Sequence, residues 1–252
     1  MTRNKHSKYL MVSARLVFIL FFSSLLQISY CQLPQIQKTN GASIQSTSTI
    51  YLDDLFKQPY KQNKYPDIKG SPFYIDDWKY ADLLFTDGKL FNKVTVKLNL
   101  YTQELIYLSP GNVEIILKDG IISRMILYDT SETGMPGSQL FASGFPVLDK
   151  DTTFPFFEVI AEGKAMLLNL IKKRITDTKD ALSPTDGKEF VTTETCYIFF
   201  NKEIKKCEKN NDFYINLFSD KKNSIENLIK LKKLKCRNRK DVTMLVEYYN
   251  SL

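Results

Sequence analysis

Apolar and polar residues alternate along much of the middle of the chain. In the segment 94–99 (VTVKLN), Val and Leu occupy every second position, with Thr, Lys and Asn between them. Successive side chains of a strand point to opposite faces, so this pattern predicts a strand with one face on a core and the other in water. Similar apolar runs, separated by turn-forming residues, continue from about residue 70 to residue 208.

These runs predict a β-rich domain. The expected strands are 80–85, 90–100, 104–108, 113–118, 121–128, 154–161, 164–175, 189–200 and 204–208. The pairs Asp87-Gly88, Pro110-Gly111 and Asp119-Gly120 favour tight turns between neighbouring runs. The segments 130–137 and 177–188 are expected to be loops. Short connections of this kind predict an antiparallel meander, either as a curved sheet or as a partly open barrel.

The periodicity changes after Asn210 and becomes helical. Two sets of apolar residues have helical spacing: Ile225, Leu228 and Ile229, then Val242, Leu245, Val246 and Tyr249. Asp241 precedes the second set and is expected to be its N-cap. The predicted fold is therefore α+β and mostly β, with a C-terminal helical hairpin at about 211–252.

The N-terminal segment 1–31 is typical of a secretory signal peptide. It carries four basic residues and no acidic residue before an apolar run at 16–26. Ser29 and Cys31 suit the positions just before a cleavage site, so the mature chain is expected to begin at Gln32. We therefore expect an exported protein, periplasmic or extracellular.

Two alternatives exist for this segment. An uncleaved membrane anchor needs about 20 apolar residues, and the run here has 11. Hence no transmembrane span is expected after cleavage. Lipid anchoring at Cys31 is the minor alternative, although Tyr30 occupies a place where lipoprotein processing requires a small residue.

The composition also divides the rest of the chain. Residues 32–69 begin rich in Gln, Ser and Thr, and they are expected to be a disordered or irregular leader. Residues 70–252 are expected to form a single β-rich domain.

Without residues 1–31 the chain keeps 31 Lys and Arg against 28 Asp and Glu, a net charge of +3. This weak charge does not indicate nucleic-acid binding.

The single histidine, His6, would leave with the signal. A mature chain without imidazole excludes Ser-His-Asp triads, Cys-His dyads and histidine-ligated zinc or iron sites. No nucleotide-binding or metal-binding motif is present, so the expectation is a non-enzymatic protein with no catalytic, metal-binding or cofactor-binding residues and no cofactor.

Three cysteines remain in the expected mature chain, which leaves at least one thiol unpaired. If Asn201-Lys202 is a two-residue hairpin turn, Cys196 faces Cys207. The register permits a disulfide. Two features disfavour it: the hydrogen-bonded pairing has a wide Cα spacing of about 5.5 Å, and Asn-Lys is a poorer turn than Asn-Gly. Both states stay open at this point.

The segment 230–240 (KLKKLKCRNRK) is the most basic part of the mature chain. Its cations are Lys230, Lys232, Lys233, Lys235, Arg237, Arg239 and Lys240. They could contact anionic lipid headgroups or another envelope polyanion. The alternative is a solvated helix face and loop.

The stretch Gly70–Tyr74, Trp78, the turn Asp87-Gly88 and the ending Glu247–Leu252 resemble uncharacterised secreted proteins of Bacteroidota. The resemblance implies export and brings no assigned activity.

Two functions follow as expectations. The first is an envelope protein that binds or supports a partner, which could be a protein, a glycan or a lipid. The second is a periplasmic carrier that encloses a lipid-like or other apolar ligand in a curved sheet. A cavity of several hundred Å³ lined by Phe, Tyr, Ile and Leu would favour the carrier. A filled core with exposed aromatic side chains would favour partner binding.

Overall fold

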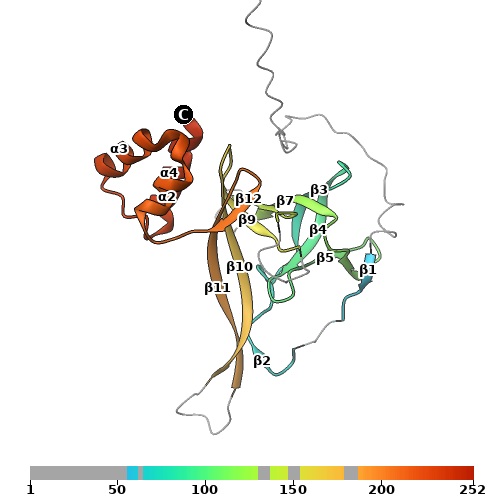
Figure 1. The fold of residues 1–252 in the computed structure, drawn as a ribbon. Coiled ribbons are helices and arrows are strands. Elements are labelled where there is room, and N and C mark those ends of the chain that lie inside the picture. The colour runs from blue at the N-terminus through green and yellow to red at the C-terminus, as the bar shows by residue number, and fades with distance from the viewer. Residues whose placement is uncertain (1–55, 62–64, 130–136, 147–153, 179–186) are drawn as a thin grey trace, which may run out of the picture. The chain divides into compact units, whose positions relative to one another are not determined.

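The computed structural model describes residues 56–61, 65–129, 137–146, 154–178 and 187–252 (Figure 1). All of them belong to one unit, Ser46–Leu252. The N-terminal segment predicted to be a signal peptide, with the lipidation candidate Cys31, lies outside the described residues, as do the loop residues 130–136 and 179–186.

The described strands form one open sheet. They are β1 Phe56–Pro59, β2 Ile68–Lys69, β3 Lys79–Phe85, β4 Leu90–Asn99, β5 Glu104–Leu108, β6 Glu114–Leu117, β7 Ile122–Asp129, β8 Gly137–Ala142, β9 Phe157–Ala161, β10 Met166–Thr178, β11 Gly187–Phe200 and β12 Glu203–Lys206. Their order is β1-β6-β5-β4-β3-β7-β8-β9-β10-β11-β12, and β2 joins β11 in parallel. The predicted mostly β, antiparallel fold is confirmed, and the sheet is curved and open instead of closed.

The sheet differs from the expected meander in three places. The Asp119-Gly120 turn does not join paired strands, because β7 crosses over to pair with β3 and leaves β6 beside β5 and β1. The strand β8 was not predicted at all. The segment expected to be an irregular leader contributes β1 and β2 to the sheet.

The longest pairing joins β10 to β11, from Met166 opposite Phe199 to Thr178 opposite Gly187 (Figure 1). At its other end β11 turns into β12 through Asn201 and Lys202, whose φ angles are 51° and 66°. Two successive left-handed residues make the turn that matches the twist of a two-residue hairpin. This turn places Tyr197 opposite Lys206, and Cys196 and Cys207 follow as the next pair.

Three helices follow β12: α2 Asn211–Leu217, α3 Lys222–Lys232 and α4 Arg239–Ser251. The two predicted helices are α3 and α4. The expectation that Asp241 caps α4 is wrong, because the N-cap is Asn238, whose side chain accepts a hydrogen bond from the Asp241 backbone N–H at 2.9 Å. Asp241 instead occupies the third helical position. In the described part of the chain, no helix has the length and apolarity needed to cross a membrane.

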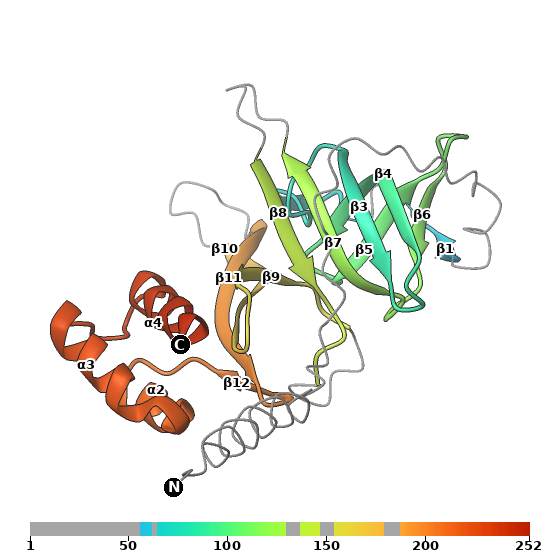
Figure 2. The same cartoon turned by 90° about the horizontal axis from the view of Figure 1, so that it is seen from above.

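The sheet carries apolar side chains on more than one face. On one face of β10 and β11, Leu167 and Ile198 pack against Ile225 of α3 and Leu245 of α4, and Figure 2 shows the helices grouped on one side of these strands. On the opposite face of the same strands, Leu168 packs with other apolar residues. A third core fills the inner side of β3–β8.

Candidate functional site

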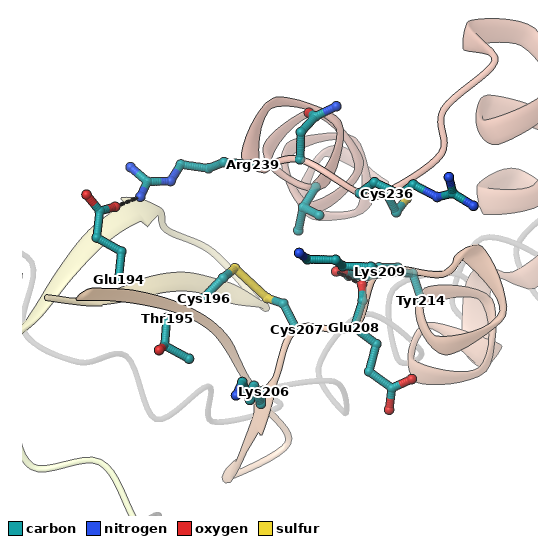
Figure 3. Close-up of a pocket in the computed structure, with 13 residues that line it drawn as sticks. Glu194, Thr195, Cys196, Lys206, Cys207, Glu208, Lys209, Tyr214, Cys236 and Arg239 are labelled. Atoms are coloured by element: carbon teal, nitrogen blue, oxygen red, sulfur yellow. Dashed lines mark hydrogen bonds and ion pairs between the residues drawn. A yellow bond between two sulfur atoms is a disulfide. The ribbon is translucent and has the colours of Figure 1, made fainter. Parts of the chain in front are cut away.

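A cavity of about 370 Å³ lies where β11 and the chain after β12 meet the loop between α3 and α4 (Figure 3). Its wall includes Cys196 from β11, Cys207 from the segment after β12, Tyr214 from α2, Cys236 from the loop and Arg239 from α4. All three cysteines expected in the mature chain therefore line one cavity.

A disulfide joins Cys196 to Cys207. The Cys207 backbone N–H donates to the Cys196 carbonyl at 2.9 Å, and the two Cα atoms are 5.3 Å apart. This is the hydrogen-bonded pairing that the sequence register implied. The Asn-Lys turn, a poorer hairpin turn than Asn-Gly, is accommodated because both its residues adopt left-handed φ. The bridge holds the segment after β12 against β11 and so fixes one wall of the cavity.

Among the cysteines that the structure describes, Cys236 carries the free thiol, and it is buried. Its φ of 51° places it in the left-handed region. The Asp241 carboxylate stabilises this conformation, because it accepts hydrogen bonds from the backbone N–H groups of Lys235 and Cys236 at 3.0 and 3.1 Å. Burial, followed by the nearby Asp241 charge, raises the pKa of the Cys236 thiol to about 11. The thiol is therefore neutral at physiological pH.

Tyr214 is the second buried polar group in this wall. Its hydroxyl donates to the Glu208 carbonyl at 2.9 Å. Burial, with smaller effects from Cys236 and Glu208, raises the pKa of Tyr214 above its usual value. Like the thiol, the phenol carries no charge near neutral pH.

Six charged side chains line the cavity: Glu194, Glu208, Lys206, Lys209, Arg237 and Arg239. Glu194 pairs with Arg239 and also accepts a hydrogen bond from buried Asn169 at 3.1 Å. The carboxylate of Glu208 accepts from Asn210 at 2.7 Å. Both acidic groups thus have partners within the protein.

The predicted basic segment is only partly brought into this site. All seven of its cations are exposed. Arg237 and Arg239 line the cavity. Lys230 and Lys232 end α3, Lys233 is its left-handed C-cap, Lys235 lies in the loop and Lys240 in the first turn of α4. Contact of this segment with an anionic surface stays a prediction.

Sequence reasoning missed the lysines contributed by the other side of the cavity. Lys206 and Lys209 come from the segment 205–209 (KKCEK), around Cys207. The available signal was this local concentration of lysine beside a cysteine whose partner was in question. Its relation to the segment 230–240, far along the chain, depends on the packing of the helices against β11.

No protein-family model, curated protein or solved structure matches the chain. The fold and the site therefore define it only by class: an open antiparallel β-sheet with three C-terminal helices and a charged cavity walled by a disulfide. Within the described ranges, no group of three or more His, Cys, Asp or Glu side chains is arranged to hold a metal ion. What the cavity offers chemically is the Lys209 ammonium and the Glu194–Arg239 ion pair beside the apolar surface of a disulfide.

Proposed function

We propose that the chain is an exported, non-enzymatic binding protein of the cell envelope, periplasmic or extracellular, whose cavity at the Cys196–Cys207 disulfide receives a polar partner. The observation that carries the proposal is the wall of this cavity, where Lys209 and the Glu194–Arg239 ion pair, from segments far apart in the sequence, lie beside a disulfide. Disulfides persist mainly in oxidising compartments, which supports export. The signal-like N-terminal segment supports it independently.

The distribution of aromatic side chains favours a polar partner over an apolar cargo. The large aromatic residues Phe141, Phe157 and Phe218 are completely buried in the cores, where they serve as packing. The cavity wall contains one aromatic residue, Tyr214, whose hydroxyl is already hydrogen-bonded. An apolar ligand would have to desolvate the charged rim, which is costly.

Elsewhere on the surface three aromatic rings are in mutual edge contact. Tyr65, Tyr101 and Phe190 have ring centroids 5.3–5.5 Å apart. Tyr101 is 39% exposed. Exposed aromatic side chains in mutual contact support partner binding.

Export is tested by expressing the full chain in a host with an envelope, followed by fractionation and intact mass measurement. We expect a product beginning at Gln32, found outside the cytoplasm and carrying an intact disulfide. The variant Phe21→Arg interrupts the apolar run and should be retained inside, while Phe21→Leu should be exported normally. Retention of the unaltered chain in the cytoplasm would overturn the proposal, and an acylated Cys31 would replace the free protein with an anchored one.

The same mass measurement tests the binding class. A lipid-sized adduct that recurs in independent preparations under native conditions would favour the apolar carrier and contradict a polar partner. Absence of such an adduct is the result expected here.

A further inference from the structure

The edge of β11 that faces away from β10 has no described partner strand along its middle. β12 covers this edge at residues 197–200, and β2 covers it at residues 188–189. Between them, no strand of the described chain pairs with the segment 190–195 (FVTTET), which we name the open edge. Residues 192–194 are exposed, and Figure 1 shows the hairpin of β10 and β11 projecting away from the three helices.

The direction of the backbone groups along the open edge follows from its neighbours. On this side of β11 the Cys196 carbonyl accepts from the Cys207 backbone N–H. The register with β10 is unbroken along all of β11, so residues two apart direct their N–H and C=O groups to the same side. The backbone groups of Thr192 and Glu194 therefore point outward, away from β10, and those of Thr193 point to β10.

The open edge lacks the usual features that protect an edge strand from pairing. Such strands are commonly protected by Lys, Pro, a bulge or a very short length. The open edge contains neither Lys nor Pro, and it has no bulge against β10. Four of its six residues are Val or Thr, which favour strands. The sequence and the register thus leave a template on which another strand can form.

The length of the open edge limits what can pair with it. β2 at one end and Cys207 at the other leave only the positions opposite residues 190–195, about 20 Å at roughly 3.3 Å per residue. The same strand of a second copy has 14 residues and would overlap both β2 and β12. The space therefore suits a short extended peptide and not a symmetric pairing of two β11 strands.

The cavity at the disulfide adjoins one end of the open edge, because Glu194 and Thr195 belong to both. In Figure 3 the Lys209 ammonium points toward the space between the disulfide and α4. Lys209 forms no ion pair with a residue in the described ranges, whereas Glu194 is already paired with Arg239. A peptide residue that reaches this end meets an available cation, which favours an acidic side chain there.

We infer that the open edge binds a short extended peptide as an added strand, antiparallel to β11, with an acidic residue before the paired stretch lying beside Lys209. Added strands bind through main-chain hydrogen bonds, while side chains give specificity. Thr192 and Glu194 supply two N–H donors and two C=O acceptors. Antiparallel pairing is the more stable kind per residue. The inference rests on the proposed function, since it names the class of partner that the same cavity receives.

The first test uses the exported protein, purified from the full-length chain, and the acetylated peptide ETVTVT with a fluorescent label at its C-terminus. In the inferred register its two Val residues lie opposite Glu194 and Thr192. N-methylation of both Val amides removes hydrogen bonds to the open edge, while N-methylation of the last two Thr amides modifies groups that point away from β11. Measured by fluorescence anisotropy, the first change should weaken binding at least about tenfold and the second less than about threefold. Equal weakening by the two would overturn the inference.

Variants of the open edge test the same pairing from the side of the protein. Thr192→Pro removes one outward N–H and keeps the hydrogen bonds to β10, since proline is tolerated where the N–H faces outward. Thr192→Val keeps that N–H and is the matched control. We expect the Pro variant to bind ETVTVT at least about tenfold more weakly and the Val variant within about twofold, both with cooperative urea unfolding. Undiminished binding by a folded Thr192→Pro protein would contradict strand addition.

The charge at the end of the open edge is tested separately. Lys209→Gln should weaken binding of ETVTVT by about two- to fivefold and leave binding of QTVTVT unchanged. Lys230→Gln removes an exposed lysine that does not line the cavity, and it should change neither. An equal effect of the two lysine variants would show attraction to net charge and remove Lys209 from the inference.

Amide hydrogen exchange measured by NMR identifies what occupies the open edge. In the free protein the amides of Thr192 and Glu194 should exchange fast and that of Thr193 slowly, and the peptide should protect the first two. Protection of these two without peptide would mean that another segment of the chain already covers the edge. A dimer in solution that Thr192→Pro abolishes would assign the edge to a second copy. Either result overturns the inference, as does failure of the folded, exported protein to bind ETVTVT, which leaves export itself untouched.

Discussion

Asn250 of α4 fills the space beside Gly163 in which any other residue would place its Cβ. A Cβ at position 163 would lie less than 3 Å from the amide of Asn250. That amide accepts from the Ala165 backbone N–H at 2.9 Å and donates to the carbonyls of Glu162 and Ala165 at 3.1 and 2.8 Å. One side chain therefore ties the end of the last helix to the turn between β9 and β10.

This relationship predicts a coupled response to mutation. Gly163→Ala should destabilise the protein by about 2 kcal/mol or more, since it combines a positive φ of 152° with a steric overlap. In an Asn250→Ala background the same substitution should cost less, because the overlapping amide is gone. Urea unfolding of the four proteins of the double-mutant cycle measures the coupling free energy.

Gly144→Ala is the matched control for backbone strain. Gly144 also has a positive φ, 87°, and nothing lies within 4 Å of its Cβ position. Gly144→Ala should lower the free energy of unfolding only by the backbone contribution, about 1 kcal/mol. If Gly163→Ala cost no more than Gly144→Ala, the contact with Asn250 would be energetically unimportant.

The ion pair between Arg124 of β7 and Glu162 predicts an asymmetric effect of removing either partner. The guanidinium lies 2.5 Å from the carboxylate, and the Arg124 side chain is only 6% exposed against 35% for Glu162. Glu162→Ala leaves a buried, uncompensated cation and should cost about 2–3 kcal/mol. Arg124→Met removes the charge itself and should cost less. Unfolding free energies in the opposite order would contradict this account.

The disulfide is expected to stabilise the protein by about 2–3 kcal/mol, because the bridge closes a short loop in the unfolded chain. The double variant Cys196→Ala/Cys207→Ala should lose this amount in urea unfolding at unchanged cooperativity. Reductant should lower the stability of the unaltered protein and leave the double variant unaffected, which serves as the control. Peptide mapping without reduction that found Cys236 in a bridge would refute the assignment.

Local signals in the sequence predicted most strands and the two longest helices. Asp87-Gly88 marked the β3–β4 hairpin, and the helical spacing of Val242, Leu245 and Val246 marked α4. These signals depend on residues only a few positions apart, so they can be recognised in a single sequence. Alternation also shows which side chains share a face of a strand, but it does not identify the strand beside it. The crossover of β7 to β3 was missed for this reason.

The cavity could not be predicted from the sequence for a similar reason. Counting from the Asn201-Lys202 turn gave the facing of Cys196 and Cys207, since register depends only on the turn. The approach of the segment around Cys207 to the loop around Cys236 depends on how three helices pack against β11, through contacts between residues far apart in sequence. The N-cap of α4 was misplaced because Asn238 and Asp241 are both favourable capping residues, and only the backbone angles distinguish them.

The buried thiol of Cys236 predicts slow, strongly pH-dependent alkylation. Only the thiolate reacts, and a pKa of about 11 leaves about one molecule in a thousand ionised at pH 8. A free cysteine, with a pKa near 8.5, is about one-quarter ionised at that pH, so labelling of the native protein should be at least about 100-fold slower. Because the pKa is raised, the rate should increase about tenfold for each pH unit from 7 to 10.

Iodoacetamide labelling followed by intact mass gives these rates, with Cys236→Ser as the unreactive control and urea-unfolded protein as the fast reference. Labelling of the folded protein at the rate of a free cysteine would contradict both the burial of Cys236 and the raised pKa of its thiol. The thiol in the cavity wall would then be partly ionised near neutral pH.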